Sequence, residues 1–317
     1  MSGRALVAKM GPLLGLIGVF LFFFAAVWLH SGRNSFATRD NLQTIALQSA
    51  IVGMATLGMT MIIISGGIDL SMGSTVALTS VVVAALLKFS GWPAVPAALG
   101  AVVAGGLCGL ANGALITGLR VVPFIVTLGS YLILRGVAKG IADERTVNPD
   151  PSALDSLLDQ SGVLPSGVWM LALLAAGVSA LLHYTRFGRH VFAIGSNEQA
   201  ARLCGVPIAR TKILVYVLGG LFAGLAGLLQ YSRLTIGDPT SAPGLELDVI
   251  AAVVIGGGSL AGGEGSVIGS LIGALFMTTI RNGCSQMGWP TWVTEIVAGA
   301  IIVGAVALDR LRHRRGL

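Results

Sequence analysis

The sequence predicts an all-α protein, a polytopic transmembrane helical bundle with about ten membrane segments, and three observations support this prediction. Hydrophobic residues make up 54% of the 317 residues and charged residues only 11%, less than half of the roughly 25% typical of soluble domains. The mean hydropathy is +0.85. Apolar runs recur along the whole chain at about the 20 residues that a helix needs to cross a bilayer, without the alternation expected of barrel strands.

Ten apolar runs are the predicted membrane segments, and each should be helical because lipid leaves no backbone group unpaired. They lie near residues 12–30, 43–64, 72–90, 93–118, 122–141, 163–184, 211–232, 246–258, 264–281 and 293–308. The run at 246–258 is too short to span a membrane alone as a straight helix. The whole chain, 1–317, is predicted to form a single transmembrane domain.

The first run has an alternative interpretation as a secretory signal, because Arg4 and Lys9 precede it. However, the apolar stretch 12–29 has 18 residues, longer than a usual signal core, and no small-residue cleavage site follows it. A retained first span is therefore the favoured interpretation.

The positive charges orient the chain. With the N-terminus inside, 12 of the 20 Lys and Arg residues fall on the inner side, and nine of these lie in the stretches 186–212 and 310–315. Lys and Arg are retained on the cytoplasmic side of membranes, so both termini are predicted to be cytoplasmic. The basic balance then reflects membrane orientation, and no nucleic-acid partner is expected.

Several enzyme signatures are absent from the sequence. It contains no phosphate-binding G-x-x-x-x-G-K-[ST] loop, no H-E-x-x-H and no Cys pairs at metal spacing. It also lacks a nucleophile–base pair of the kind that an intramembrane hydrolase would need. We therefore expect no catalytic residue, no metal site and no cofactor, and any nucleotide-driven work must come from a partner.

Glycine residues fall into regular stripes and into two breaks. Small residues four apart, such as Gly105, Gly109 and Gly113, predict close helix–helix packing. The breaks are "IISGGIDLSMGS" (63–74) and "VIGGGSLAGGEGS" (254–266), and paired Gly-interrupted segments are typical of transport pathways.

The breaks and the polar residues near them supply the candidate pathway or gate residues. Asp69 has two interpretations, as the N-cap of the following helix or as a gate residue at membrane depth. Asn112 is expected to form an interhelical hydrogen bond, with pathway lining as the alternative. The full candidate set is Gly66, Gly67, Asp69, Asn112, Asp248, Gly257, Gly258 and Glu264.

The stretch 142–162 is predicted to be an outer, periplasmic loop. It holds five acidic residues and one Arg, and Ser152 could cap a short helix there. A solvated loop and a docking surface for an external partner are both open interpretations.

The inner loop at 185–210 contains a short charged helix in an otherwise apolar chain. Asn197 can cap this helix, Glu198 lies where the helix dipole favours an anion, and Gly205 can end it. So short a helix is unstable alone in water, because nucleation is too costly. The small side chains around Ala201 suit a groove in another protein better than a membrane surface, which favours bulky anchors.

Four stretches in order along the chain resemble the permeases of ribose-type sugar importers of the ATP-binding-cassette (ABC) class. They are "GMTMIIISGGIDLSMGS", "VPFIVTLGSYLILRGVAKGI", "RFGRHVFAIGSNEQAARLCGV" and "LDVIAAVVIGGGSLAGGEGSVIGSLIGAL". The resemblance covers about 40–308. The larger group also contains branched-chain amino-acid permeases, and "GGIDLSMGS" favours the sugar branch.

The resemblance implies a type II ABC-importer-like permease in the bacterial inner membrane that moves a monosaccharide such as ribose, xylose or galactose by alternating access. Its partners would be a cytoplasmic ABC ATPase, a periplasmic sugar-binding protein, a second permease (a copy or a homologue) and membrane lipid. The residues implied to couple to the ATPase are Asn197, Glu198, Gln199, Ala201, Arg202, Leu203 and Gly205.

Other transport functions remain open at this point. A permease of the same group for a branched-chain amino acid or an autoinducer-type solute is one alternative. An ion-coupled secondary carrier is another, but its candidate relay residues, Asp69, Arg135, Asp248 and Glu264, are scattered along the sequence.

Overall fold

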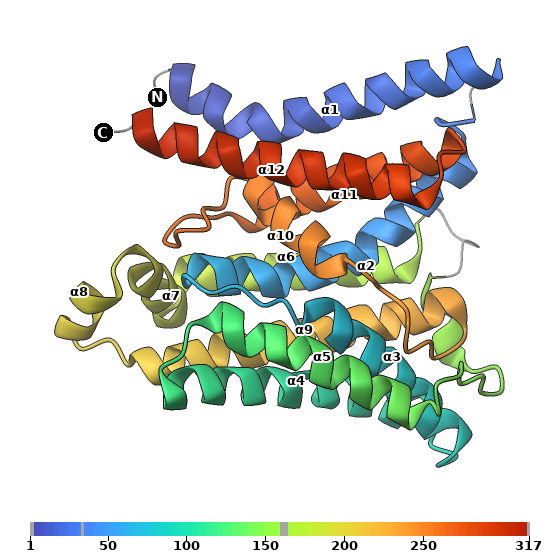
Figure 1. Ribbon diagram of the computed structural model, residues 1–317, viewed down its shortest axis with the longest axis horizontal. Helices are drawn as coiled ribbons and strands as arrows, with labels where there is room; N and C mark the ends of the chain where they lie inside the picture. Colours follow the sequence, from blue (N-terminus) through green and yellow to red (C-terminus); the bar gives the residue numbers. More distant parts are fainter. Residues whose placement is uncertain (1–2, 33–34, 159–163, 316–317) are drawn as a thin grey trace.

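The computed structural model describes residues 3–32, 35–158 and 164–315, and these ranges form a helical bundle without any named strand (Figure 1). The predicted outer loop 142–162 therefore lies partly outside the described residues. The helices are α1 Gly3–Ser31, α2 Arg39–Ile64, α3 Met72–Lys88, α4 Ala94–Leu119, α5 Pro123–Ile141, the 3₁₀-helix η1 Ala153–Leu158, α6 Ser166–Tyr184, α7 Arg186–Ser196, α8 Glu198–Leu203, α9 Ile208–Leu234, α10 Leu245–Ile255, α11 Val267–Gln286 and α12 Thr291–Arg315.

Seven helices of the described chain are long and apolar enough to cross a membrane, namely α1, α2, α4, α5, α6, α9 and α11. Two further apolar stretches, Met72–Lys88 and Thr291–Ala307, are shorter, and α10 has only 11 residues. The all-helical, multi-pass prediction is confirmed, whereas the count of about ten membrane segments stays a prediction.

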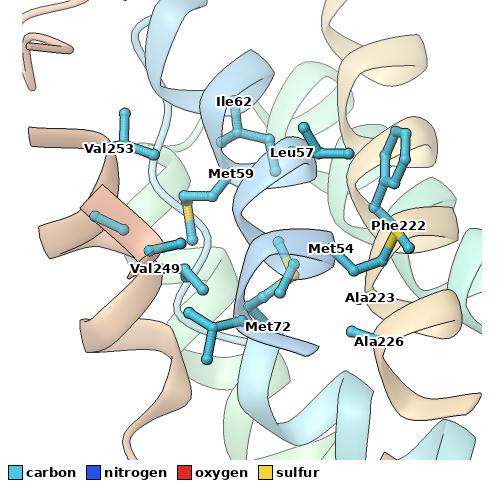
Figure 2. Packing of buried hydrophobic residues seen from close by; sticks show 14 of the residues in the cluster. Met54, Leu57, Met59, Ile62, Met72, Phe222, Ala223, Ala226, Val249 and Val253 are labelled. Carbon is cyan, nitrogen blue, oxygen red and sulfur yellow. The ribbon is translucent and has the colours of Figure 1, made fainter. Parts of the chain in front are cut away.

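Helix α2 forms the centre of the bundle. Its apolar stretch is 94% buried, against 11% for α5 and 17% for α1, so the outer helices expose the apolar surface that lipid would cover. Met59 of α2 points toward Val249 of α10, and Met54 points toward Phe222 of α9 on the other side (Figure 2). α2 therefore links the two halves of the molecule.

Helices α3 and α10 both begin inside the bundle. After α2 ends, the chain runs back into the bundle as a non-helical segment before α3 starts, and the segment before α10 enters from the opposite end (Figure 1). The two helix starts meet, because a Cβ on Gly73 of α3 would contact the Glu246 side chain of α10. Non-helical backbone at this depth is tolerated only where protein or water surrounds it.

The glycine stripes do mediate close packing, as predicted. A Cβ on Gly105 of α4 would lie 2.9 Å from the Gly224 Cα of α9, and one on Gly113 would lie 2.9 Å from the Ile213 Cα. Small residues let the backbones of α4 and α9 approach where lipid offers no hydrophobic driving force.

One predicted helix cap is wrong. Helix α3 begins at Met72 with Ser71 as its N-cap, so Asp69 lies too far upstream to cap it. The Asp69 Oδ1 instead accepts hydrogen bonds from the Ser71 amide (2.8 Å) and hydroxyl (2.6 Å). The carboxylate therefore closes an Asx turn in the non-helical segment.

The first turn of α1, the last turn of α12 and the α7–α8 segment all lie at one end of the bundle (Figure 1). We call this the α8 end. The arrangement agrees with the predicted grouping of the termini and 185–210 on one side, while its assignment to the cytoplasm stays a prediction.

Candidate functional site

The short helix α8 has the boundaries that the sequence predicts. Its N-cap is Asn197, whose Oδ1 accepts a hydrogen bond from the Ala200 amide (2.9 Å). It ends at Leu203, and Gly205 follows with φ +79°, in the left-handed region that favours glycine. With six residues, α8 keeps its shape through these caps and through its attachment to the bundle.

Only one face of α8 packs on the bundle. Ala201 is buried against Ile194 of α7 and Ile208 of α9. Leu203 is 90% exposed, and Gln199 is exposed as well. The face of α8 that carries Leu203 and Gln199 is therefore left uncovered by the rest of the described chain.

Glu198 connects α8 to the membrane-spanning helix α9. Its carboxylate accepts from Lys212 of α9 (2.6 Å) and from Arg202 one turn along α8 (3.1 Å). The hydrogen bond from Lys212, with the charge of Arg202 adding to it, lowers the pKa of the Glu198 carboxyl below its usual value. These three residues line a groove of about 550 Å³ beside the α4–α5 turn, which includes Arg120 and Pro123.

Helix α7 joins α8 to the two Gly-rich breaks at one contact point. A Cβ on Gly195 of α7 would collide with the Ile64 carbonyl and the Gly263 amide. The Gly263 N–H donates to that same carbonyl (2.9 Å). We call Ile64, Gly66, Gly195, Gly262 and Gly263 the glycine junction.

Of the other pathway candidates at this end, Gly67 is buried and Glu264 is exposed. Gly257 has φ +91°, and Gly258 donates to the Val253 carbonyl (2.8 Å) in the turn that ends α10. These residues share the α8 end with the glycine junction.

Asp69 and Asn112 belong to one buried hydrogen-bond network. Asn112 of α4 donates through Nδ2 to the Ser71 hydroxyl (2.9 Å) and accepts from the Ser130 hydroxyl of α5 (2.5 Å). With the Asp69–Ser71 bonds, the network fastens the non-helical segment to α4 and α5. The expected interhelical bond of Asn112 is confirmed, and neither residue is part of the groove at Glu198.

A cavity larger than the groove at Glu198 lies at the opposite end of the bundle. Its volume is about 830 Å³, and its walls are α2, α11, the C-terminal end of α9 and the segment that leads into α10. Asp248 is the single pathway candidate that reaches it. The Asp248 Oδ1 accepts from Arg281 Nη2 (2.8 Å) and its Oδ2 lies 2.6 Å from Arg281 Nε.

Most of the residues that line this cavity were missed by the sequence analysis. The polar ones include Asn41, Thr44, Gln48, Gln230, Ser241, Thr278, Arg281, Asn282 and Ser285. The spacing of these polar residues could have predicted the cavity. Residues 41, 44 and 48 share one face of a helix, and so do residues 278, 281, 282 and 285. We call this cavity the polar cavity.

The chain matches one family model along most of its length. The model describes the permease component of branched-chain amino acid transport systems, and it matches residues 41–306.

Curated relatives cover almost the whole chain. The Ribose import permease protein RbsC of Escherichia coli (strain K12) is 38% identical over 286 residues, 88% of each chain. RbsC of Bacillus subtilis (strain 168) is 37% identical over 95% of this chain and 92% of its own. The Xylose transport system permease protein XylH of E. coli (strain K12) is 34% identical over 95% of this chain and 91% of its own. No solved structure matches the chain.

Proposed function

Because the chain belongs to the family of permease components of branched-chain amino acid transport systems, we propose that it is the membrane subunit of an ABC importer for a monosaccharide. The observation that carries the sugar assignment is the similarity to ribose and xylose permeases over 88% to 95% of the chain. The chain is a transport subunit rather than an enzyme, so the energy of ATP must enter through a partner.

Helix α8 is the element through which the ATPase acts. In this proposal a cleft of the ATPase contacts Leu203, Gln199 and Arg202. The shape of the helix is fixed by Asn197, Gly205 and buried Ala201. The exposure of Leu203 supports the contact. Glu198 passes the movement to α9 through Lys212, and α7 passes it to the glycine junction.

The proposed assembly places the α8 end, with both termini, in the cytoplasm of a bacterium and the polar cavity toward the periplasm. The chain then crosses the inner membrane about ten times, counting shorter helices. A periplasmic sugar-binding protein delivers the sugar to the cavity end, and a second permease, a copy or a homologue, completes the channel. Alternating access follows when the ATPases close and move the two α8 helices together.

Radiolabelled uptake tests the proposed function. The chain is expressed with an ABC ATPase and a sugar-binding protein from the same organism, and uptake of D-ribose, D-xylose and L-arabinose is compared with uptake of leucine. We expect ATP-dependent uptake of at least one pentose and none of leucine. Leucine uptake without pentose uptake would move the chain to the amino-acid branch of the family. Uptake that needs an ion gradient but no ATPase would overturn the ABC assignment.

The partner proposals have their own experiment. Co-purification of the tagged chain in mild detergent, followed by mass spectrometry, should recover an ATPase and a second permease. The mass of the complex then distinguishes a copy of this chain from a homologue.

A further inference from the structure

The polar cavity has the size of a small-molecule site and is partly open to the surface. Its volume of about 830 Å³ lies within the roughly 300–1,000 Å³ typical of ligand pockets, and a monosaccharide fits with room for water. It is formed within one chain, by helices far apart in sequence. A site in each permease is distinct from a channel that forms only between two permeases.

The lining of the cavity suits a neutral ligand with many hydroxyl groups. Amide and hydroxyl side chains such as Gln48, Gln230, Thr44 and Ser285 can both donate and accept, as sugar hydroxyls require. Arg281 and Asp248 form a two-point ion pair, and Asp40, Arg233 and Asp238 also line the cavity. The many donors and acceptors of this lining therefore suit a polyol.

Besides Arg281 Nε, which faces the Asp248 carboxylate, two buried atoms of the lining lack any hydrogen-bond partner in the described structure. They are the Oδ1 of Asn282 and the Oγ of Ser241, and the two residues are only 5% and 6% exposed. Buried polar atoms are rarely left unpaired, because the lost hydration is not replaced. Both residues line the cavity, so a turn of either side chain toward the cavity would give these closed-off atoms the hydroxyl groups of a bound sugar as partners.

The amides of one wall are already held in place. Asn282 Nδ2 and Gln286 Nε2 both donate to the Asn41 Oδ1 (2.9 Å each), and Asn41 Nδ2 donates to the Phe36 carbonyl (2.8 Å). The three amides join α2 to α11 before any ligand arrives. A prearranged wall lowers the entropy cost of binding.

We propose that the polar cavity is a monosaccharide-binding site within each permease chain, in which Ser241, Asn282 and the Asp248–Arg281 pair contact the sugar hydroxyls. This inference rests on the proposed function and adds a place where the sugar pauses after it leaves the binding protein. Helix α10 starts beside this site and ends at the turn next to the glycine junction, so occupation of the site is linked to the α8 end.

Paired serine variants test the proposal. In Ser241→Ala the lost hydroxyl has no protein partner, so the fold should remain intact while sugar binding weakens. Ser270→Ala is the matched control, because Ser270 also carries a buried, unpartnered hydroxyl but lies outside the cavity. Asp248→Asn is the third variant, since it keeps the shape of the side chain and removes the ion pair.

The uptake rate at saturating sugar is the first measurement, because the soluble binding protein is then fully loaded and the membrane step is limiting. We expect Ser241→Ala to lower this rate by about 3- to 10-fold, the effect of one hydrogen bond, and Asp248→Asn to lower it further. Ser270→Ala should match the wild type. Isothermal titration of D-ribose, D-xylose and L-arabinose into the purified chain in nanodiscs should rank the variants in the same order. The wild type and Ser270→Ala should bind most tightly, Ser241→Ala more weakly and Asp248→Asn most weakly.

The outcomes separate this inference from the proposed function. Intact pentose uptake by the wild type, with unchanged rates in Ser241→Ala and Asp248→Asn, would overturn the cavity site alone. Equal losses in Ser241→Ala and Ser270→Ala would also overturn it, because the effect would then be structural. Absence of pentose uptake in the wild type would instead refute the proposed function.

Discussion

At the scale of single residues, Glu198 has the most specific role, since one carboxylate holds two cations from different helices. Both of its pairs lie near the surface, and exposed ion pairs contribute only about 0–1 kcal/mol to stability. The Lys212 side chain is less exposed (19%) than that of Arg202 (66%). The pair with Lys212 therefore sets the orientation of α8 on α9 more than it stabilises the fold.

Replacing Lys212 by Met tests this orientation. Lys212→Met keeps the length of the side chain but removes the ion pair, so we expect the number of sugar molecules moved per ATP to fall roughly two- to fivefold, within the range for residues that couple two sites. Reconstituted vesicles with the partner subunits give this ratio. Lys139→Met, exposed at the other end of the bundle, is the control, and an equal loss there would contradict the role of Lys212.

The lowered pKa of Glu198 makes a prediction about pH. A carboxyl with a lowered pKa keeps its ion pairs above its ordinary value of about 4.3 and loses them only as the pH falls through the lower one. The difference in coupling between the wild type and Lys212→Met should thus stay constant from about pH 5.5 to 8. A difference that disappears with a midpoint near pH 6 would assign the effect to a histidine.

At the scale of elements, the apolar runs predicted where the helices lie, because run length and the need to pair backbone groups leave few alternatives. Sequence could not predict that α3 and α10 begin within the bundle, because this depends on the meeting of Gly73 and Glu246, which are distant in the chain. The interpretation of Asp69 as an N-cap was wrong for a different, local reason. A local pattern does not distinguish an N-cap from an Asx turn two residues upstream.

The polar cavity was missed because hydropathy averages over a segment. Polar side chains on one face of α2 and α11 are outnumbered by the apolar residues around them. The caps of α8, in contrast, depend on neighbours in sequence, and Asn197 and Gly205 could therefore be predicted.

The glycine junction gives the prediction at this scale. In Gly195→Ala the added methyl would collide with the Ile64 carbonyl, so the backbone must shift at a cost of about 1–3 kcal/mol. Thermal unfolding in detergent should show a lower melting temperature, together with reduced transport. Gly177→Ala is the control, since nothing lies within 4 Å of its Cβ position, and it should be neutral or slightly stabilising. Equal melting temperatures for both variants would show that the glycine junction has room for the added methyl group, which would contradict the close contact.

At the scale of the whole molecule, the two cavities lie at opposite ends, with the buried helix α2 between them. The described structure closes the space between the ends with side chains such as Met54, Leu57 and Ile62. The core of the chain therefore offers no passage between the two ends, and in the proposed assembly a passage must form where the chain meets the second permease.

The native cysteines test the orientation of the molecule. Cys204 at the end of α8 is exposed, Cys284 is buried and Cys108 is partly buried. A membrane-impermeant maleimide should label Cys204 in inside-out vesicles and leave it unlabelled in intact spheroplasts, with Cys204→Ser as the control. Labelling of Cys204 in spheroplasts would invert the topology and remove α8 from the reach of any ATPase.

The shortness of α10 limits what insertions the chain can accept. Its 11 residues rise by about 16 Å, and this single rigid rod separates the carboxylate of Asp248 from the turn at Gly257. One extra residue in its middle would lengthen it by only about 1.5 Å but would rotate everything beyond by about 100°. Asp248 and the turn at Gly257 would each keep their side chains and backbone, but their orientation relative to each other would change. Helix α10 should therefore tolerate substitution far better than any change of length.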